Sequence, residues 1–286
     1  MAMPAFTLAR RFQAGETVFT GWCGLPYPLL AETLAREGFP AVAVESQHGL
    51  WDVAGILHAV AAIRQGGAAP MVRVPLNDFA LVSRALDFGA EGIIAPMINT
   101  PADARAFAAA AKFPPLGERS WGPHRAMALG GVSDMPTYLR EANDHIVTFA
   151  MIETRTALQN FEAIINTPGI DGFFLGPSDL SIALSDGKTV DPLSKEVDEH
   201  LDKMIAGAQK AKKIPGAYST SAERAVGFAK RGVRFITVSS DLAMFRAGAA
   251  AALRRRSRPG QHARQRAVAP DPVMHQRSAG MDAGEN

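Results

Sequence analysis

Residues 172–184, GFFLGPSDLSIAL, contain the pattern that decides the fold. A short apolar run, Phe173 to Leu175, stops at Gly176-Pro177, and the carboxylate of Asp179 follows two residues later. Apolar runs of this length, bounded by turn residues, are typical of strands buried in a parallel sheet. The acidic residue after the strand has two interpretations, because it either caps a following helix or binds a metal ion.

The same alternation of a short apolar run and a helical stretch recurs from residue 17 to residue 253. Several helical stretches end at a glycine, as helices often do. Strands alternating with helices in this way predict an α/β fold of the (β/α)8 TIM barrel type. A doubly wound open sheet is the alternative, but the first turn reads GWCGLP and lacks its glycine fingerprint. The predicted strands cover residues 17–24, 41–45, 68–74, 92–96, 145–153, 172–176, 214–218 and 234–238.

Composition excludes several classes of protein. The chain has 286 residues, 47% of them hydrophobic, and a formal net charge of +2, which argues against a broad nucleic-acid-binding face. Cys23 is the single cysteine, so no internal disulfide is possible. The N-terminal residues do not resemble a signal peptide, and no apolar run reaches the roughly 18 residues of a membrane span. We therefore expect a cytoplasmic protein with no membrane or nucleic-acid partner.

The sequence predicts one folded domain and a tail. Residues 1–255 are expected to form the barrel, and residues 256–286, which are rich in Arg, Pro and Gly, are expected to be a disordered extension. The arginines of the tail offer an alternative function, in which a catalytically silent barrel binds partners through this basic segment.

The barrel places the catalytic groups at the carboxyl ends of its strands. Glu153 and Asp179 end the fifth and sixth units, so they can share one divalent cation such as Mg²⁺, Mn²⁺ or Co²⁺. Each residue alone is also compatible with a role at a helix N-terminus. The other polar or aromatic residues at strand ends include Trp22, Glu45, Gln47, His48 and Arg73.

Two of these residues suit acid–base and anion-binding roles. His48 can act as a general base near neutral pH, or it is simply a loop histidine bonded to a backbone carbonyl. Arg73 can bind a substrate carboxylate or an enolate oxygen, or it forms a salt bridge with Glu45 or Glu153. A cation beside such an arginine and base suits enolate chemistry on a 2-oxo acid, which needs no Schiff-base lysine.

Six segments together resemble the HpcH/HpaI aldolases, a family of class II, metal-dependent pyruvate aldolases. The resemblance covers about residues 5–253, and the I-E-T-R and G-P-S-D-L stretches are specific in combination. The segments are VESQHGLWD (44–52), PMVRVPLND (70–78), GIIAPMINT (92–100), KFPPLGERSWGPHRA (112–126), MIETRTALQN (151–160) and DGFFLGPSDLS (171–181).

The resemblance implies a barrel of the phosphoenolpyruvate/pyruvate type whose eighth helix is swapped between subunits, in a hexamer built as a trimer of dimers. It implies reversible cleavage of a 4-hydroxy-2-oxo acid, such as 4-hydroxy-2-oxoheptanedioate, to pyruvate and an aldehyde.

The roles that it implies are a metal site at Glu153 and Asp179, with Arg73 on the keto oxygen. His48 would be the base, acting through a water on the cation and supported by Asp87 of a neighbouring chain. The substrate would be bound by Trp22, Gln47 and the backbone around Gly176, Pro177 and Ser178.

The chain departs from the family pattern near the expected cation. Many members read D-G-E-H where this chain has Glu45-Ser46-Gln47-His48, and many carry Gln where Met151 stands. These changes leave the two metal ligands intact and leave the acceptor aldehyde open. A citrate-lyase-like reaction on an acyl-CoA is the alternative within the carbon–carbon lyases.

Overall fold

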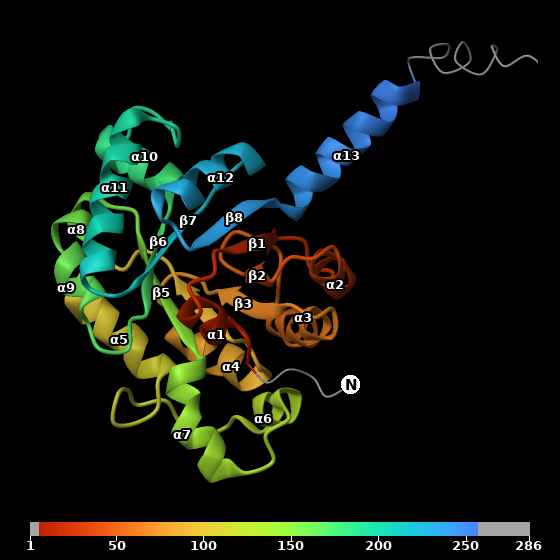
Figure 1. Ribbon diagram of the computed structural model, residues 1–286, viewed down its shortest axis with the longest axis vertical. Helices are drawn as coiled ribbons and strands as arrows, with labels where there is room; N and C mark the ends of the chain where they lie inside the picture. The colour runs from red at the N-terminus through yellow and green to blue at the C-terminus, as the bar shows by residue number, and fades with distance from the viewer. Residues whose placement is uncertain (1–5, 257–286) are drawn as a thin grey trace, which may run out of the picture. The chain divides into compact units, whose positions relative to one another are not determined.

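Eight parallel strands close into a barrel in the computed structural model, which describes residues 6–256 (Figure 1). Each strand pairs with the next along the chain, and β1 pairs with β8 to complete the ring. The strands are β1 (Val18–Cys23), β2 (Ala41–Glu45), β3 (Ala69–Arg73), β4 (Gly92–Ala95), β5 (Val147–Ile152), β6 (Gly172–Leu175), β7 (Ile214–Ala217) and β8 (Phe235–Ser240). The predicted barrel is confirmed, although β8 continues two residues beyond its expected end at residue 238.

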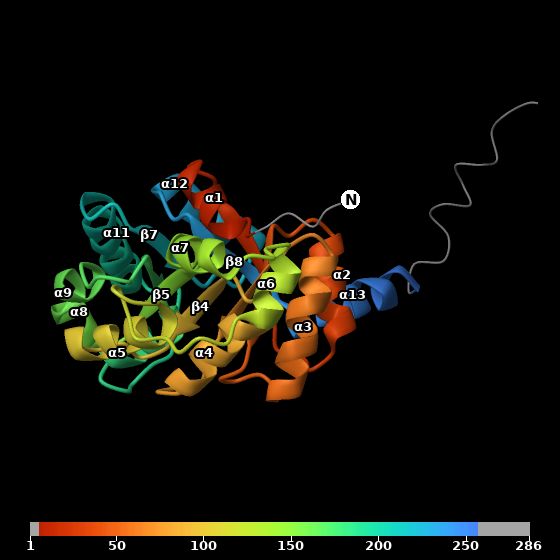
Figure 2. The ribbon, with the colours of Figure 1, turned by 90° about the horizontal axis from the view of Figure 1, so that it is seen from below.

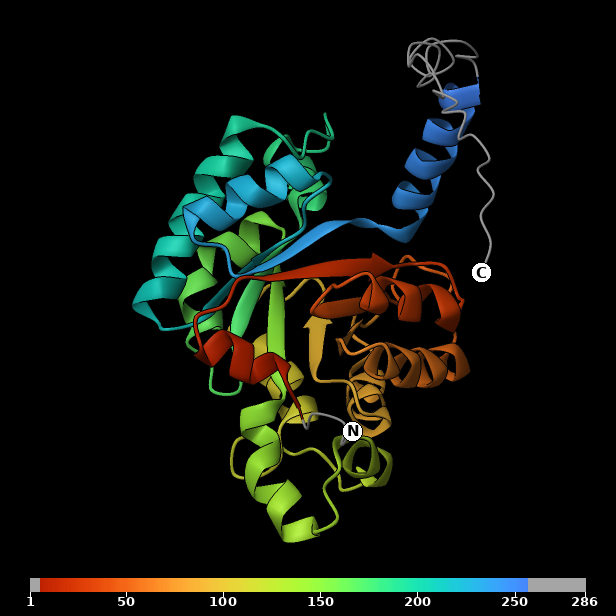
Figure 3. The same ribbon diagram turned by 45° about the vertical axis from the view of Figure 1, so that its right-hand side comes forward.

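Helices lie outside the strands (Figure 3), and the connections are more elaborate than one helix per strand. Three helices join β4 to β5, and two helices each follow β5 and β6. The sequence did not predict α1, α6 and α7, which are short or contain proline near their start, and it offered α10 only as a possible helix after the sixth strand. The helices are α1 (Leu8–Gln13), α2 (Pro28–Arg36), α3 (Val53–Gln65), α4 (Phe79–Phe88), α5 (Pro101–Ala111), α6 (His124–Gly130), α7 (Met135–His145), α8 (Arg155–Gln159), α9 (Phe161–Ile165), α10 (Pro177–Leu184), α11 (Lys195–Lys210), α12 (Ala222–Arg231) and α13 (Asp241–Arg256).

The chain divides into two compact units, residues 1–244 and residues 245–286. The first contains the whole barrel and the start of α13, and the second contains the rest of that helix. Apart from Arg256, the tail expected over 256–286 lies outside the described residues. Across residues 6–256, no helix has the length and apolar character needed to cross a membrane.

Aromatic side chains fill the inside of the barrel. The rings of Phe149 and Phe235 stack with centroids 4.8 Å apart, and Phe174 stacks on Trp22 at 5.8 Å. Glycines on the strands make room for them, since a Cβ on Gly172 would lie 2.7 Å from the Phe149 ring. The barrel is therefore a packed core, and space for a ligand remains only at its ends.

Helix α1 packs at the amino ends of the strands, next to α7 (Figure 2). The Glu91 carboxylate fixes its start, because Oε2 accepts hydrogen bonds from the backbone N–H groups of Thr7 at 2.6 Å and Leu8 at 2.8 Å. The other carboxylate oxygen lies 3.1 Å from the buried Arg64 guanidinium. The buried Glu91 carboxylate thus both caps the start of α1 and pairs with the buried Arg64 guanidinium.

Glu91→Ala should destabilise the protein by about 3–5 kcal/mol, because Arg64 would remain buried without its counter-ion. Urea denaturation followed by circular dichroism measures this loss. The matched control is Glu16→Ala, which removes an exposed ion pair with Arg11 and should cost less than about 1 kcal/mol. Equal losses in the two variants would show that the buried pair has no special weight.

Candidate active site

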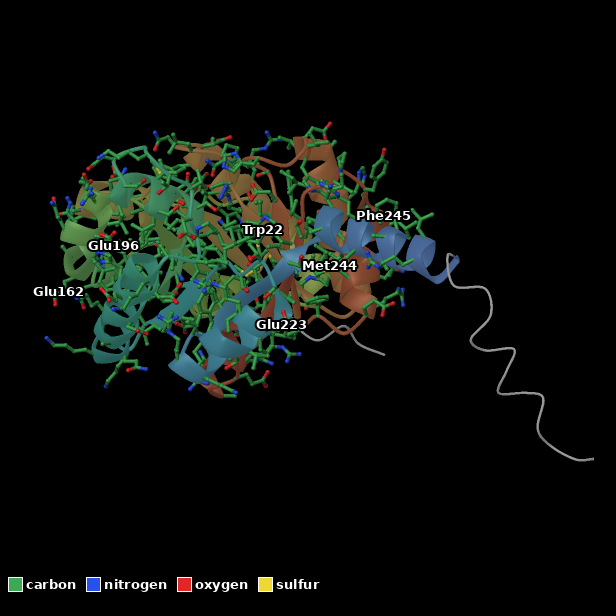
Figure 4. All side chains as sticks on the ribbon, turned by 90° about the horizontal axis from the view of Figure 1, so that it is seen from above. Trp22, Glu162, Glu196, Glu223, Met244 and Phe245 are labelled. Carbon is green, nitrogen blue, oxygen red and sulfur yellow. The ribbon has the colours of Figure 1, made fainter. Side chains whose placement is uncertain are left out.

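A cavity of about 540 Å³ opens at the carboxyl ends of the strands, where the barrel fold predicts an active site. Trp22 lies within the ribbon in Figure 4, whereas Glu162 and Glu196 project at its edge. The predicted residues that line the cavity are Trp22, His48, Arg73, Gly176, Pro177, Ser178 and Asp179. Glu153, Gln47 and Asp87 do not line it.

Glu153 follows β5 directly and is buried just behind the cavity wall. Its Oε1 accepts a hydrogen bond from the backbone N–H of Met97 at 2.8 Å, while Oε2 has no hydrogen-bond partner among the described residues. Burial raises the pKa of Glu153 to about 7; the Met97 hydrogen bond opposes this rise and the charge of Asp179 adds to it. Burial disfavours the ionised form of this carboxylate, and one of its oxygens has no partner among the described residues. A cation bound to that oxygen would stabilise the ionised form.

Asp179 lies in the first turn of α10 and is exposed. It is not the N-cap of this helix, because Gly176 occupies that position and makes no side-chain capping bond. The simple capping interpretation is therefore wrong for Asp179. Glu153 lies one residue before α8, whose cap is Thr154, because the Thr154 hydroxyl accepts from the Ala157 N–H at 3.0 Å.

Gly176 lies beside the free oxygen of Glu153 and begins the helix turn that carries Asp179. A Cβ at this position would lie 2.2 Å from Glu153 Oε2, so any other side chain would occupy the space beside the free oxygen. Pro177 has no N–H, and the first N–H groups of a helix have no acceptor within it. The donors available to a substrate carboxylate at this turn are therefore those of the residues around Pro177, with the helix dipole in favour.

Arg73 ends β3 and is buried at the cavity floor. Its Nε lies 3.1 Å from Glu45 Oε2, so the salt bridge that the sequence left open is present. Its Nη1 donates to the sulfur of Met151 at 3.7 Å, and its guanidinium lies 5.9 Å from the Trp22 ring centroid. The guanidinium is oriented by these contacts and still lines the cavity.

Glu45 also fixes the loop that carries His48. Its Oε1 accepts from the backbone N–H groups of Gln47 at 2.7 Å and His48 at 3.0 Å. His48 is exposed at the cavity rim, while Gln47 points elsewhere, with its buried Oε1 lacking a hydrogen-bond partner in the described part of the chain. The sequence offered the salt bridge between Glu45 and Arg73 as an alternative, but it gave no sign that Glu45 also fixes the loop of His48.

Asp87 lies near the end of α4, away from the cavity lining. Its carboxylate accepts a hydrogen bond from Nη2 of the buried Arg119 at 2.6 Å. Asp87 is expected to support the base of a neighbouring chain. Its position within one chain does not test that role, which stays a prediction.

Tyr218 and Ser240 also line the cavity, and the sequence analysis did not assign them a role. Tyr218 follows β7 and packs edge-on against Trp22, with ring centroids 5.4 Å apart. Burial raises the pKa of its phenol, so the hydroxyl stays protonated and can donate a hydrogen bond. A tyrosine at the last position of the predicted strand 214–218 was the available signal.

The two carboxylates fit a hard divalent cation that keeps water or substrate oxygens as its other ligands. Nowhere in residues 6–256 do three or more His, Cys, Asp or Glu side chains converge in a way that suits a metal. The site thus joins an acidic pair, a fixed guanidinium and an imidazole around one cavity, which is a donor set for generating and stabilising an enolate.

Residues 19–247 match the HpcH/HpaI aldolase/citrate lyase family. The hydroxypyruvate/pyruvate aldolase of Rhizorhabdus wittichii is 40% identical over 239 residues, 82% of this chain and 92% of that protein. The 4-hydroxy-2-oxovalerate aldolase of Novosphingobium aromaticivorans is 34% identical over 261 residues, 89% of this chain and 96% of the relative.

A crystal structure of an HpcH/HpaI aldolase from Desulfitobacterium hafniense superposes with a TM-score of 0.82 at 26% identity, covering 90% of this chain and 98% of the other. The family match and these identities agree with the barrel and the site at its mouth. The chain therefore belongs to the HpcH/HpaI aldolase/citrate lyase family and is a carbon–carbon lyase.

Proposed function

We propose that this chain catalyses the reversible aldol cleavage of a 4-hydroxy-2-oxo acid to pyruvate and an aldehyde. The observation that carries the proposal is the free, buried Oε2 of Glu153, which Gly176 leaves open toward the helix turn of Asp179. The names of the related aldolases support the same reaction class. The cavity of about 540 Å³ suits a small organic acid.

Glu153 and Asp179 would hold a divalent cation, with Mg²⁺, Mn²⁺ and Co²⁺ as the candidates. When bound, such a cation supplies Lewis-acid polarisation of the substrate's keto group. The N–H groups around Pro177 would orient the substrate carboxylate, and the stacked ring of Trp22 would form the apolar floor beneath it.

In the cleavage direction, His48 accepts the proton of the C4 hydroxyl group. The C3–C4 bond breaks, the carbonyl of the aldehyde forms, and the electron pair of the broken bond moves to the C2 oxygen. Arg73 stabilises the resulting enolate oxygen, because its guanidinium is already oriented by Glu45 and need not reorganise. Return of the proton to C3 gives pyruvate.

The acyl-CoA alternative finds less support at this site. A nucleotide needs several cationic groups, and Arg73 is the single Lys or Arg among the residues that line the cavity. The cavity lining, which includes His48, Arg73 and Asp179, also supports a catalytic function of the barrel. It favours this function over the alternative of a silent barrel that binds partners through the basic tail.

The assembly that we propose is a hexamer, a trimer of dimers in which the last helix is exchanged between subunits. Its support is the family resemblance, together with the need to bring Asp87 of one chain to the base of another. The length of α13, sixteen residues from Asp241 to Arg256, is sufficient for such an exchange.

With Mn²⁺ or Mg²⁺ present, the protein should exchange the methyl protons of pyruvate with D₂O, as followed by NMR. EDTA should stop the exchange, and Asp179→Asn should reduce it at least about a hundredfold by weakening the metal site. The exposed Asp202→Asn is the matched control and should behave as wild type. Exchange that persists in EDTA would contradict the metal-dependent mechanism.

Arg73→Ala should lower kcat by about a hundredfold or more, or roughly 3 kcal/mol of transition-state stabilisation, while metal binding persists. Steady-state kinetics and Mn²⁺ titration measure the two effects separately. Loss of the folded barrel in this variant would instead assign Arg73 a structural role through its pair with Glu45.

In metal-free buffer the free energy of unfolding should fall as the pH rises from about 4.5 to about 7, because folding raises the pKa of Glu153 from 4.5 to about 7. The protonated Glu153 contributes fully to the free energy of unfolding below pH 4.5, and this contribution is lost as the pH rises through about 7. Its size is on the order of 3 kcal/mol.

Denaturant unfolding in EDTA between pH 5 and pH 8 measures this dependence. Glu153→Gln should flatten the curve, whereas the exposed Glu162→Gln should leave it unchanged. Parallel curves for wild type and Glu153→Gln would contradict the raised pKa.

A further inference from the structure

Arg155 lies two residues after Glu153 and reaches across to the far end of α10. Its Nε donates a hydrogen bond to the carbonyl oxygen of Ala183 at 2.9 Å, and its Nη2 donates to that of Leu184. Nη2 also lies 3.4 Å from the exposed Asp186 carboxylate. Two adjacent carbonyl groups at one helix end are therefore bound by one planar guanidinium, for which lysine has no equivalent.

The helix that Arg155 holds is the one that carries Asp179. Helix α10 runs from Pro177 to Leu184, so Asp179 and Ala183 are one turn apart on a single rigid element. A cation near the C-terminal carbonyl groups of a helix is also favoured by the helix dipole. The position of the Asp179 carboxylate thus depends on where Arg155 fixes the other end of the helix.

The segment that carries Arg155 is itself fixed on the side of β4. Besides the bond from Met97 to Glu153, the hydroxyl of Thr154 donates to the side-chain oxygen of Asn99. The side-chain amide of Asn160 donates to the Asn99 backbone carbonyl at 2.9 Å. Residues 153–155 are therefore anchored, and a guanidinium that extends from them is a fixed reference for α10.

We propose that Arg155 is a positioning residue that sets the Asp179 carboxylate against Glu153 by docking the C-terminal end of α10 onto the strand end. The inference rests on the proposed metal site and adds a residue that touches neither metal nor substrate. The inference accounts for the order of residues in I-E-T-R. Glu153 would bind the metal, Thr154 caps α8, and Arg155 would align Asp179.

The test is the affinity for Mn²⁺, measured from the free-ion signal in electron paramagnetic resonance. Arg155→Ala should weaken binding about tenfold, as the loss of a group that orients a ligand typically does. At saturating Mn²⁺ its kcat should recover most of the wild-type value, because no reacting group is missing. Arg155→Lys should fall between the two, since it restores the charge but cannot bind both carbonyl groups.

Two control variants separate positioning from general stability. Arg231→Ala removes another half-buried arginine, which bonds the Asp198 carbonyl at 2.7 Å and links α12 to α11. It should lower the melting temperature but leave the Mn²⁺ affinity unchanged. Asp186→Asn removes only the charge of the exposed ion pair, at a position whose φ of 52° asparagine also adopts readily, and should bind Mn²⁺ as wild type does.

Wild-type Mn²⁺ affinity in Arg155→Ala would overturn the inference while leaving the proposed function intact. Equal weakening in Arg155→Ala and Arg231→Ala would also overturn it, because the effect would then follow from stability alone. A wild-type protein that binds no Mn²⁺ would overturn the proposed function and, with it, this inference.

Discussion

The burial of charge at the carboxyl ends of the strands is the constraint on which the site depends. Glu45, Arg73 and Glu153 are all nearly inaccessible to solvent, and a buried ion is costly unless it is paired and hydrogen-bonded. The Arg73 guanidinium forms an ion pair with Glu45 at 3.1 Å, and Glu45 also accepts hydrogen bonds from two backbone N–H groups. Glu153 accepts a hydrogen bond on one oxygen only, so its other oxygen is a buried acceptor without a partner among the described residues.

The packing of the interior explains why this charge lies at the mouth. Phe149, Phe174 and Phe235 occupy the barrel axis, and Trp22 covers the top of their stack. The charged groups Glu45, Arg73 and Glu153 therefore lie at the strand ends, where loops from different strands meet. The rigid aromatic base gives the cavity a fixed floor against which a small substrate is oriented.

The sequence was sufficient to predict the barrel and most of the site, because strand runs and strand-end residues carry local signals. Trp22, His48, Arg73 and Asp179 were found in this way, and all of them line the cavity. The salt bridge between Glu45 and Arg73 was one alternative that the sequence offered, but the bonds from Glu45 to the loop of His48 were not predicted, because they depend on side-chain geometry. The extent of the short helix α10 was not predicted, because eight residues are too few to display a helical period.

Gly176 has a consequence for the redesign of this enzyme. One methyl group there would press on the Glu153 carboxylate, so any other residue at this position would displace that carboxylate from its present place. Another part of the cavity wall tolerates change, because Leu50 and Leu242 line the cavity and their side chains are exposed. A library aimed at new aldehydes should therefore randomise that wall and leave the glycine turn untouched.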